Sequence, residues 1–373
     1  MKQGKVLVGL SGGVDSSVSC ALLKNSGYVV SAAFLRFWEV DGRSYRALAD
    51  AKAICNFLKI PLEIVDARAE FKKNVLEYFL DEYARGRTPN PCIFCNERMK
   101  FGLLLETAKK MGIEMVATGH YARQSREFID PNFQFQKKYT ILTDKDDVEN
   151  KVNYKLLEAK DGSKDQSYFL YRLKQEQLAR IIFPLGEYEK TEVRKMAEKF
   201  RLPVFDKSDS QDVCFMANNG LEEFLKGKIE LKRGKIVDTE GKILGEHRGL
   251  PLYTIGQRRG IEIGGTGPHF VVSKDMARNV LVVTNRLNYP GVAQKKIELS
   301  DVSWVGGIAP KLPLAVLART RYHNPLVCAI IKNSDGQGAC LVEFDVPQKA
   351  VSPGQSVVFY SKYGEILGGG VIE

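Results

Sequence analysis

The sequence lacks any long hydrophobic run, and this absence is the first feature that limits the class of protein. No apolar stretch approaches the length of a membrane span, about eighteen residues. The N-terminus, MKQGKVLVGLSGG, has one short apolar run, without the longer apolar segment and small-residue cleavage site of a signal peptide. Internal repeats and low-complexity tracts are also absent. We therefore expect a cytoplasmic protein with no membrane partner.

Histidine is scarce, and the cysteines are not spaced as a zinc site. The chain has four histidines without ligand spacing, and its seven cysteines form a single C-x-x-C, at Cys92 and Cys95. Structural zinc needs four nitrogen or sulfur ligands, so a zinc site is not expected. In a reducing cytoplasm most of these cysteines are expected to be thiols, which argues against a structural disulfide at the C-x-x-C.

The composition that remains is that of an ordinary globular protein with an excess of positive charge. The chain has 373 residues, which predicts two or three domains, and 44% hydrophobic residues, enough to bury real cores. Its formal net charge of +10 favours a polyanionic partner, of which nucleic acid is the commonest. The basic residues are scattered rather than grouped, so the charge alone identifies no partner.

Strands and helices alternate in the first third of the chain. Residues 5–10, 28–35, 62–66 and 115–120 have the short apolar pattern of strands, and helical spacing lies between them. This alternation predicts an α/β fold with a doubly wound, mostly parallel sheet that binds ligands at the carboxyl ends of its strands.

The pattern changes after this region. Residues 124–155 are polar, with one strand-like piece at 133–142, and we interpret them as a surface elaboration. Residues 234–247 are typical of a hairpin, and short β-rich runs from about residue 295 predict a small antiparallel barrel or sandwich.

The loop GLSGGVDSS, at residues 9–17, lies between the first strand and the first helix. Its glycines allow a close approach to an anion, and the helix N-terminus supplies free N–H donors. A Walker A lysine is missing; the loop carries Asp15 instead, an acid that suits phosphates if Mg²⁺ lies between them. The competing interpretation is a glycine-rich turn in which Asp15 caps the helix.

The cysteines fall into two groups. Four lie at apolar positions of expected helices or barrel strands and are interpreted as packing: Cys20, Cys55, Cys328 and Cys340. Cys95 precedes an expected helix, whose N-terminus would lower the thiol pKa. Cys214 lies in a polar loop, KSDSQDVCF, where packing does not explain a cysteine.

Eight motifs, taken in order, resemble one family. The first loop resembles the S-G-G-x-D-S pyrophosphate loop of the PP-loop ATP pyrophosphatases, which place AMP on a carbonyl or amide oxygen. It is followed, as in bacterial tRNA-specific 2-thiouridylases, by GRTPNPCIFCNERMKFG, TGHYAR, KDQSYFLY, FPLGEYEKTEVRKMAE, KSDSQDVCF, YTIGQRRG and RYHN. The resemblance covers nearly the whole chain and rests on independent motifs.

The resemblance implies a fold, an activity and a set of site residues. It implies a PP-loop catalytic domain at 1–216, related to the adenine nucleotide α-hydrolases, a central tRNA-contacting domain at 217–280 and an antiparallel β-barrel at 281–373. The implied activity exchanges oxygen for sulfur at C2 of the wobble uridine of tRNA. Cys95 corresponds to the family's nucleophile and Cys214 to the cysteine that carries the persulfide.

The binding residues are implied in the same way. ATP would be bound by Gly9, Leu10, Ser11, Gly12, Gly13, Val14, Asp15, Ser16, Leu35 and Gly119. The target base would face Asn90, Pro91 and Cys92, and further tRNA contacts would come from His120, Lys164, Asp165, Gln166, Arg321, Tyr322 and Gln355. The implied cofactors are ATP and Mg²⁺, and the implied partners are a tRNA with a wobble uridine and a persulfide donor or relay protein.

Cys92 departs from the family pattern, in which many members have N-P-D where this chain has N-P-C. A third thiol beside Cys95 and Cys214 leaves open an iron–sulfur cluster with one free iron in place of a persulfide. Two other hypotheses remain at this point: a PP-loop enzyme that activates tRNA for a nitrogen nucleophile, and a non-catalytic tRNA-binding protein.

Overall fold

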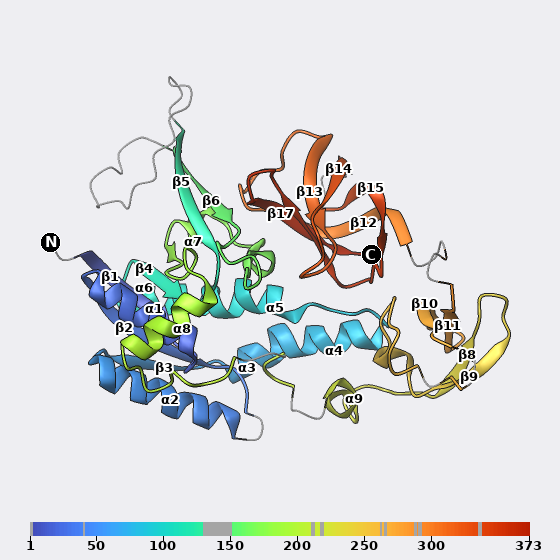
Figure 1. Cartoon of the computed structure of the whole chain (residues 1–373), viewed down its shortest axis with the longest axis horizontal. Coiled ribbons are helices and arrows are strands. Elements are labelled where there is room, and N and C mark those ends of the chain that lie inside the picture. Colours follow the sequence, from blue (N-terminus) through green and yellow to red (C-terminus); the bar gives the residue numbers. More distant parts are fainter. Residues whose placement is uncertain are drawn as a thin grey trace.

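The computed structural model describes residues 3–39, 42–129, 151–209, 213–216, 220–261, 263–264, 267–286, 289, 293–334 and 338–373. Figure 1 shows an α/β body on the left, a barrel at the upper right and a smaller β body at the lower right. Among these described residues, no helix is long and apolar enough to cross a membrane.

The α/β body is built on a five-stranded sheet in which all neighbouring strands are parallel. Its order is β3-β2-β1-β4-β7. The strands are β1 (Gln3–Gly9), β2 (Tyr28–Arg36), β3 (Leu62–Asp66), β4 (Met115–Thr118) and β7 (Ile181–Ile182). Val6, Leu7 and Val8 are fully buried, as expected when helices cover both faces of a parallel sheet. The predicted parallel sheet is confirmed.

Alternate side chains of β1 face two different cores. Val6 and Val8 pack in a core with residues of α1 (Val14–Asn25), α2 (Arg43–Leu58) and α8 (Lys190–Lys199), whereas Leu7 packs with α6 (Gly102–Lys110). This period of two is the ordinary alternation of a strand. It places helices on both faces, so the sheet is doubly wound.

Two long helical runs lie beside this sheet. One consists of α3 (Arg68–Phe71), the π-helical η1 (Lys72–Leu76) and α4 (Glu77–Ala84); the other consists of α5 (Pro91–Phe94), the π-helical η2 (Cys95–Phe101) and α6. The second run begins with a proline in its first turn, where the missing N–H costs nothing. Cys95 therefore lies inside a continuous helical run, and the expectation that it precedes the helix is wrong.

The C-terminal strands form a closed antiparallel barrel. They are β12 (Ala293–Trp304), β13 (Leu314–Arg319), β14 (Val327–Ser334), β15 (Cys340–Lys349), β16 (Ser356–Tyr360) and β17 (Glu365–Ile372). Pairing of β12 with both β15 and β17 closes the sheet. Of the two predicted arrangements, the barrel is thus the one formed.

A hairpin from the α/β part of the chain extends this barrel sheet. β5 (Arg123–Ile129) pairs with β6 (Lys151–Leu157), and β6 pairs with β17 at Glu365 and Ile366. The sequence did not predict these two strands, which begin and end the segment interpreted as a surface elaboration. The strand-like piece at 133–142 lies outside the described residues.

The smaller β body has a four-stranded sheet of order β10-β11-β8-β9. Its elements are α9 (Gly220–Leu225), β8 (Gly234–Val237), β9 (Ile243–His247), the 3₁₀ turn η4 (Leu250–Leu252), β10 (Phe270–Asp275) and β11 (Val280–Thr284). β8 and β9 form the predicted hairpin. The remaining short helices, η3 (Ser167–Leu170) and α7 (Gln175–Leu178), lie in the α/β part of the chain.

Of the four cysteines interpreted as packing residues, one differs from the others in its exposure. Cys20, Cys55 and Cys340 are buried, as predicted, but Cys328 is exposed. On β14 the neighbouring Ala329 faces the barrel core, so alternation turns Cys328 outward. The packing prediction for Cys328 is wrong for this reason.

Candidate active site

The loop after β1 turns back on itself before α1 begins. The Ser11 N–H donates to Ser16 Oγ at 3.2 Å, and the Ser16 hydroxyl donates to the Gly13 carbonyl at 3.3 Å. The Ser17 hydroxyl donates to the same carbonyl at 2.6 Å. Gly13 is extended, which frees the first N–H groups of α1 for an anion.

Two positions require glycine, because the backbone there lies too close to other backbone atoms for a Cβ. Gly12 has φ +75°, and a Cβ there would lie 2.4 Å from the Ala47 carbonyl oxygen. A Cβ at Gly119, just after β4, would lie 2.7 Å from the Ser16 backbone nitrogen. Leu35 is the residue before the last of β2, which lies on the other side of β1. The predicted nucleotide-binding residues therefore gather at one edge of the sheet.

Asp15 is the centre of a network of charged and polar side chains. Its carboxylate accepts hydrogen bonds from Lys190 Nζ at 2.6 and 2.8 Å and from the Tyr121 hydroxyl at 2.9 Å. Lys190 is 8% exposed and lies 3.0 Å from Asp209, so one buried ammonium serves two carboxylates. Sequence reasoning missed Lys190, because nothing local predicts a partner 175 positions away.

More cations surround this network. Lys164 lies 3.3 Å from Asp209, and Arg194 pairs with the same carboxylate. Lys207 Nζ donates to the Gly12 carbonyl at 3.0 Å. The pKa of Asp209 is lowered, because its bonds and charge contacts with Lys190 and the other cations outweigh the opposing effect of burial. The loop thus lies among lysines and an arginine that suit a polyphosphate.

The residues present fit ATP and a hard divalent cation. The crowded glycines and free N–H groups form a cradle for phosphates, and Asp15 and Asp209 offer the oxygen ligands that Mg²⁺ prefers. Within the described part of the chain, no three His, Cys, Asp or Glu side chains are grouped to hold a metal ion. The iron–sulfur cluster alternative stays a prediction.

The three thiols that sequence analysis singled out lie within electrostatic range of one another. Ionised Cys214 would raise the pKa of Cys92 and of Cys95, and the charge of Lys100 lowers the pKa of all three. Cys95 also packs in one cluster with Val213 and Phe215, the neighbours of Cys214. Cys214 is held by its neighbours: Phe215 packs 5.7 Å from Phe71, and Arg43 donates to the Met216 carbonyl at 2.7 Å. A loop far along the chain is therefore anchored beside η2.

The pKa of the Cys95 thiol is shifted upward, whereas the sequence predicted a downward shift. Burial raises the pKa of Cys95 to about 12, and the positive charge of Lys100 only partly opposes this. Burial also raises the pKa of Cys92. Cys214 is exposed, yet the protein packed around its sulfur raises its pKa against the opposing effects of Lys100 and the Trp38 side chain. Helix-terminal activation of Cys95 is therefore wrong; Lys100 is the group that favours the thiolates.

The segment before α5 is braced by the barrel. The Gln355 side-chain amide donates to the Thr88 carbonyl at 2.7 Å, and the Thr88 N–H donates to the Pro353 carbonyl at 2.8 Å. Asn90 is half-buried and is the last residue of this segment before Pro91. Gln355 thus lies where it can position the predicted base-facing residues.

The segment 164–166 lies beside the nucleotide loop. Asp165 is 3% exposed and accepts hydrogen bonds from Ala159 and Ser167, so its bonds are internal. Gln166 accepts from the Tyr121 N–H at 3.0 Å and donates its own N–H to the Tyr121 carbonyl at 2.8 Å. Gln166 therefore holds the residue that bonds Asp15.

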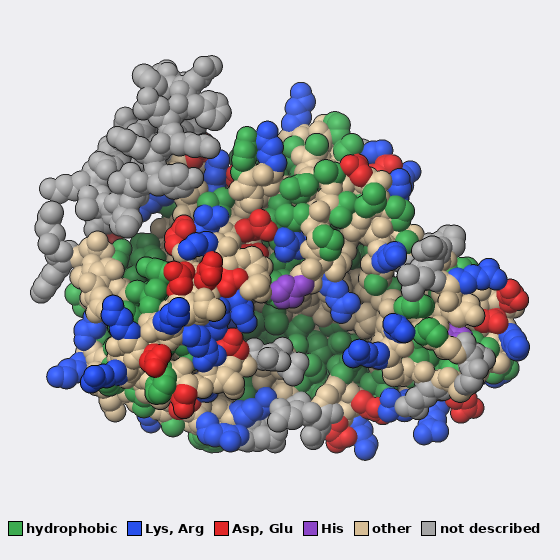
Figure 2. Space-filling view, viewed as in Figure 1, with side chains coloured by type: hydrophobic (Ala, Val, Ile, Leu, Met, Phe, Trp, Pro, Cys, Tyr) green, Lys and Arg blue, Asp and Glu red, His purple; other side chains and the backbone are tan. Residues whose placement is uncertain are grey.

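The other predicted RNA contacts differ in exposure. Arg321 is exposed, and Tyr322 packs 4.5 Å from the Phe169 ring. His120 is buried against Phe101, and its burial lowers the ring pKa well below the ordinary value, so the imidazole is neutral. Figure 2 shows Lys and Arg side chains scattered over this face, with acidic side chains among them, around a hollow with a hydrophobic floor.

These features define a class: a nucleotide-binding α/β domain joined to two β bodies, with three thiols that share the charge of Lys100. Family models match in the same order: the tRNA methyl transferase HUP domain at 4–218, the tRNA methyl transferase PRC-barrel domain at 222–285 and the aminomethyltransferase beta-barrel domain at 294–372.

The sequence has full-length relatives. The tRNA-specific 2-thiouridylase MnmA of Nitrosomonas eutropha is 42% identical over 383 residues, covering 100% of this chain and 99% of the relative. That of Vibrio cholerae is 42% identical over 384 residues, covering 100% and 96%. The chain belongs to the tRNA-specific 2-thiouridylase family. A solved NMN synthetase from Francisella tularensis is 17% identical, with a TM-score of 0.32 over 55% of this chain and 66% of that one.

Proposed function

We propose that this protein is a tRNA-uridine 2-sulfurtransferase, which uses ATP to replace the C2 oxygen of a wobble uridine with sulfur. The observation that carries the proposal is that Cys95 packs in one hydrophobic cluster with Phe215 and Met216, which follow Cys214 in the chain, although the two cysteines are far apart in sequence. A methyl transfer or an attack by nitrogen would need no such thiol pair. A protein that only held tRNA would need neither the thiols nor the loop.

In the first step the nucleotide loop binds ATP. The uracil C2 oxygen attacks the α phosphate and pyrophosphate leaves, because oxide is too poor a leaving group to be displaced directly. The N–H groups at the start of α1, with Lys190 and Lys207, stabilise the charge that develops on the phosphates. Asp15 and Asp209 would hold Mg²⁺, which when bound neutralises phosphate charge.

In the second step sulfur moves from Cys214 to the uridine. The Cys95 thiolate attacks Sγ of the Cys214 persulfide; one S–S bond breaks, another forms, and the terminal sulfur leaves as HS⁻ with the electron pair. This HS⁻ adds to C2, and AMP departs with the former C2 oxygen. The products are 2-thiouridine and a Cys95–Cys214 disulfide, which a dithiol reductant must open before the next turnover.

Lys100 favours this chemistry in a site that otherwise disfavours thiolates. Its charge lowers the pKa of all three thiols, in opposition to burial. Cys92 occupies the place of the family's acid; as a half-buried thiol with a raised pKa it is protonated at neutral pH and can donate a hydrogen bond. A persulfide-donor or relay protein loads Cys214, whose exposed position suits that transfer.

The tRNA substrate must present a base that has left its stack. The segment Asn90–Cys92 faces that base, while Arg321 on the barrel and Lys164 near the loop contact the backbone of the RNA. A cytoplasmic location supplies both tRNA and the reducing agent.

The experiment is mass spectrometry of nucleosides from tRNA treated with the purified protein, ATP, Mg²⁺ and a persulfide source. We expect 2-thiouridine with the wild-type protein and none with Cys214→Ser, whereas Cys328→Ser, an exposed thiol outside the site, keeps the activity. Failure of the wild-type protein to form 2-thiouridine in the presence of a demonstrated Cys214 persulfide would refute the proposal.

A further inference from the structure

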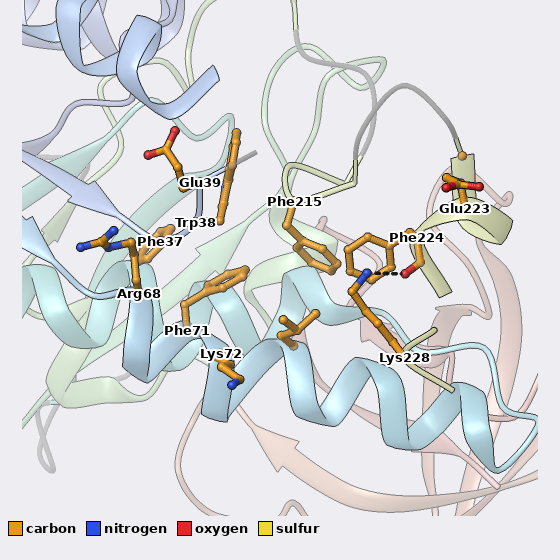
Figure 3. Close-up of a pocket in the computed structure, with 12 residues that line it drawn as sticks. Phe37, Trp38, Glu39, Arg68, Phe71, Lys72, Phe215, Glu223, Phe224 and Lys228 are labelled. Atoms are coloured by element: carbon orange, nitrogen blue, oxygen red, sulfur yellow. Dashed lines mark hydrogen bonds between the residues drawn. The ribbon is translucent and has the colours of Figure 1, made fainter. Parts of the chain in front are cut away.

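A cavity lies next to the loop that holds Cys214, since Phe215 is one of its lining residues. It has a volume of about 400 Å³, within the range of small-ligand pockets. Five aromatic rings line it, from the segment after β2, from α3, from the Cys214 loop and from α9: Phe37, Trp38, Phe71, Phe215 and Phe224. Figure 3 shows these rings gathered around the same space.

The rings divide into a buried floor and accessible sides. Phe71 and Phe215 are only 2% and 4% exposed and pack against each other at 5.7 Å. Phe37, Trp38 and Phe224 are half-buried, so parts of their rings remain accessible to a ligand. A flat, apolar ligand would meet aromatic surface on several sides.

The cavity adjoins the thiols. Phe215 follows Cys214 in the chain, and the Trp38 side chain bonds the Cys214 sulfur. Any ligand of the cavity is therefore a close neighbour of the group that reacts with the uridine.

The rim carries more positive than negative charge. Its cations are Arg68, Lys72 and Lys228, and its acids are Glu39 and Glu223. Glu39 is paired with Arg36 at 2.6 Å and Arg68 with Asp66 at 2.6 Å, which leaves Lys72 and Lys228 as the main rim cations; Lys228 lies 4.5 Å above the Phe224 ring. Aromatic faces bordered by cations are the combination that binds single-stranded nucleic acid, with bases on the rings and phosphates on the cations.

We propose that this cavity binds an unstacked base of the anticodon loop directly adjacent to the target uridine. The inference rests on the proposed function, which places the target uridine itself against the thiols and the nucleotide loop. Binding a neighbouring base here holds the loop open and sets which nucleotide enters the reaction site. The aromatic lining makes the cavity tolerant of base identity, since every base has a stacking face.

The test measures affinity for anticodon stem-loop RNAs that are intact or lack the base on the 5′ or the 3′ side of the target uridine. Phe224→Leu keeps apolar volume on α9 but removes the ring; Phe224→Tyr is the matched control that keeps it. We expect Leu to weaken binding of intact RNA about tenfold and Tyr to leave it unchanged. For one of the two base-deleted RNAs, the Phe224→Leu variant and the wild-type protein should bind with equal affinity. A thermal melt of each variant checks folding.

Three results would overturn the inference. One is an equal loss with both base-deleted RNAs, and another is no loss with intact RNA. The third is unchanged RNA affinity with slower loading of Cys214 by a persulfide-donor protein, which would assign the cavity to that protein. If the wild-type protein makes 2-thiouridine and any of these results appears, only the inference fails; if it binds RNA but makes none, the proposed function fails by itself.

Discussion

Lys190 is the single side chain on which the nucleotide site depends most. It lies 2.6 Å from Asp15 in the loop and 3.0 Å from Asp209, a few residues before Cys214. One ammonium therefore joins the loop after β1 to the segment that precedes Cys214.

Replacing Lys190 with Met should slow pyrophosphate release by about 100-fold, because a preorganised charge that stabilises the leaving group is lost. Lys195→Met is the matched control, since Lys195 is exposed on the same helix. The measurement is single-turnover pyrophosphate release with saturating RNA. A Lys190→Met rate close to that of the control would show that the lysine only holds Asp15 in the folded protein.

Lys100 sets the reactivity of Cys95. The pKa of Cys95 is about 12, so its thiolate fraction, and hence its rate of alkylation, should rise with pH throughout the neutral range. Lys100→Met removes a charge that lowers this pKa; each unit of increase cuts the thiolate fraction about tenfold at a given pH. Peptide mapping after iodoacetamide treatment measures the rate, with Lys109→Met as the control on the same helical run. A rate in Lys100→Met equal to that of the control contradicts the role of Lys100.

Functional residues could be predicted from the sequence only where their partners are near in the sequence or where they belong to a motif. The glycines of the loop, Asp15 and the two cysteines are of this kind. The pKa of Cys95 was predicted in the wrong direction, because helix entry at Pro91 and burial among aromatic side chains are properties of the fold. Lys190 and Asp209 carry no local signal, since their meeting depends on how α8 lies beside α1.

At the scale of elements, the β5–β6 hairpin joins the catalytic part of the chain to the barrel. Glu158, just after β6, accepts a bond from Arg319 of β13 at 2.9 Å, and its backbone carbonyl accepts one from Arg123 at 2.7 Å. Burial raises the pKa of Glu158, and Arg319 opposes that effect. The pairing therefore fixes the barrel against the α/β body.

Arg319→Met should lower the free energy of unfolding by about 1–3 kcal/mol, the contribution of a hydrogen bond to a charged group. Arg321→Met is the matched control: Arg321 is exposed, and its loss should leave stability unchanged. Denaturant unfolding followed by circular dichroism makes the comparison. Equal stability of the two variants would mean that Glu158 and Arg319 do not join the two bodies.

The parallel sheet and the hairpin at 234–247 could be predicted because their patterns are local. The strands of the β5–β6 hairpin could not, because β6 is completed by β17 at the other end of the chain. Amphipathic pattern shows which residues can form a strand, but not which distant strand will pair with it.

At the scale of the whole molecule, the excess of positive charge should govern RNA binding. The net charge of +10 is scattered over the chain rather than concentrated in one block. Binding should weaken linearly on a plot of log affinity against log salt, and Arg321→Met should reduce the slope by about one, as expected for one lost phosphate contact. Fluorescence titration at several salt concentrations measures both. An unchanged slope would place Arg321 outside the RNA interface.

The most direct test of the account follows one labelled sulfur atom through a single turnover. Protein carrying a ³⁴S-labelled persulfide on Cys214 is mixed with ATP, Mg²⁺ and tRNA without reductant, and nucleosides and peptides are analysed by mass spectrometry. We expect labelled 2-thiouridine and a Cys95–Cys214 disulfide in equal amounts, and no labelled product from Cys95→Ser. Labelled 2-thiouridine formed without that disulfide would contradict the transfer proposed here.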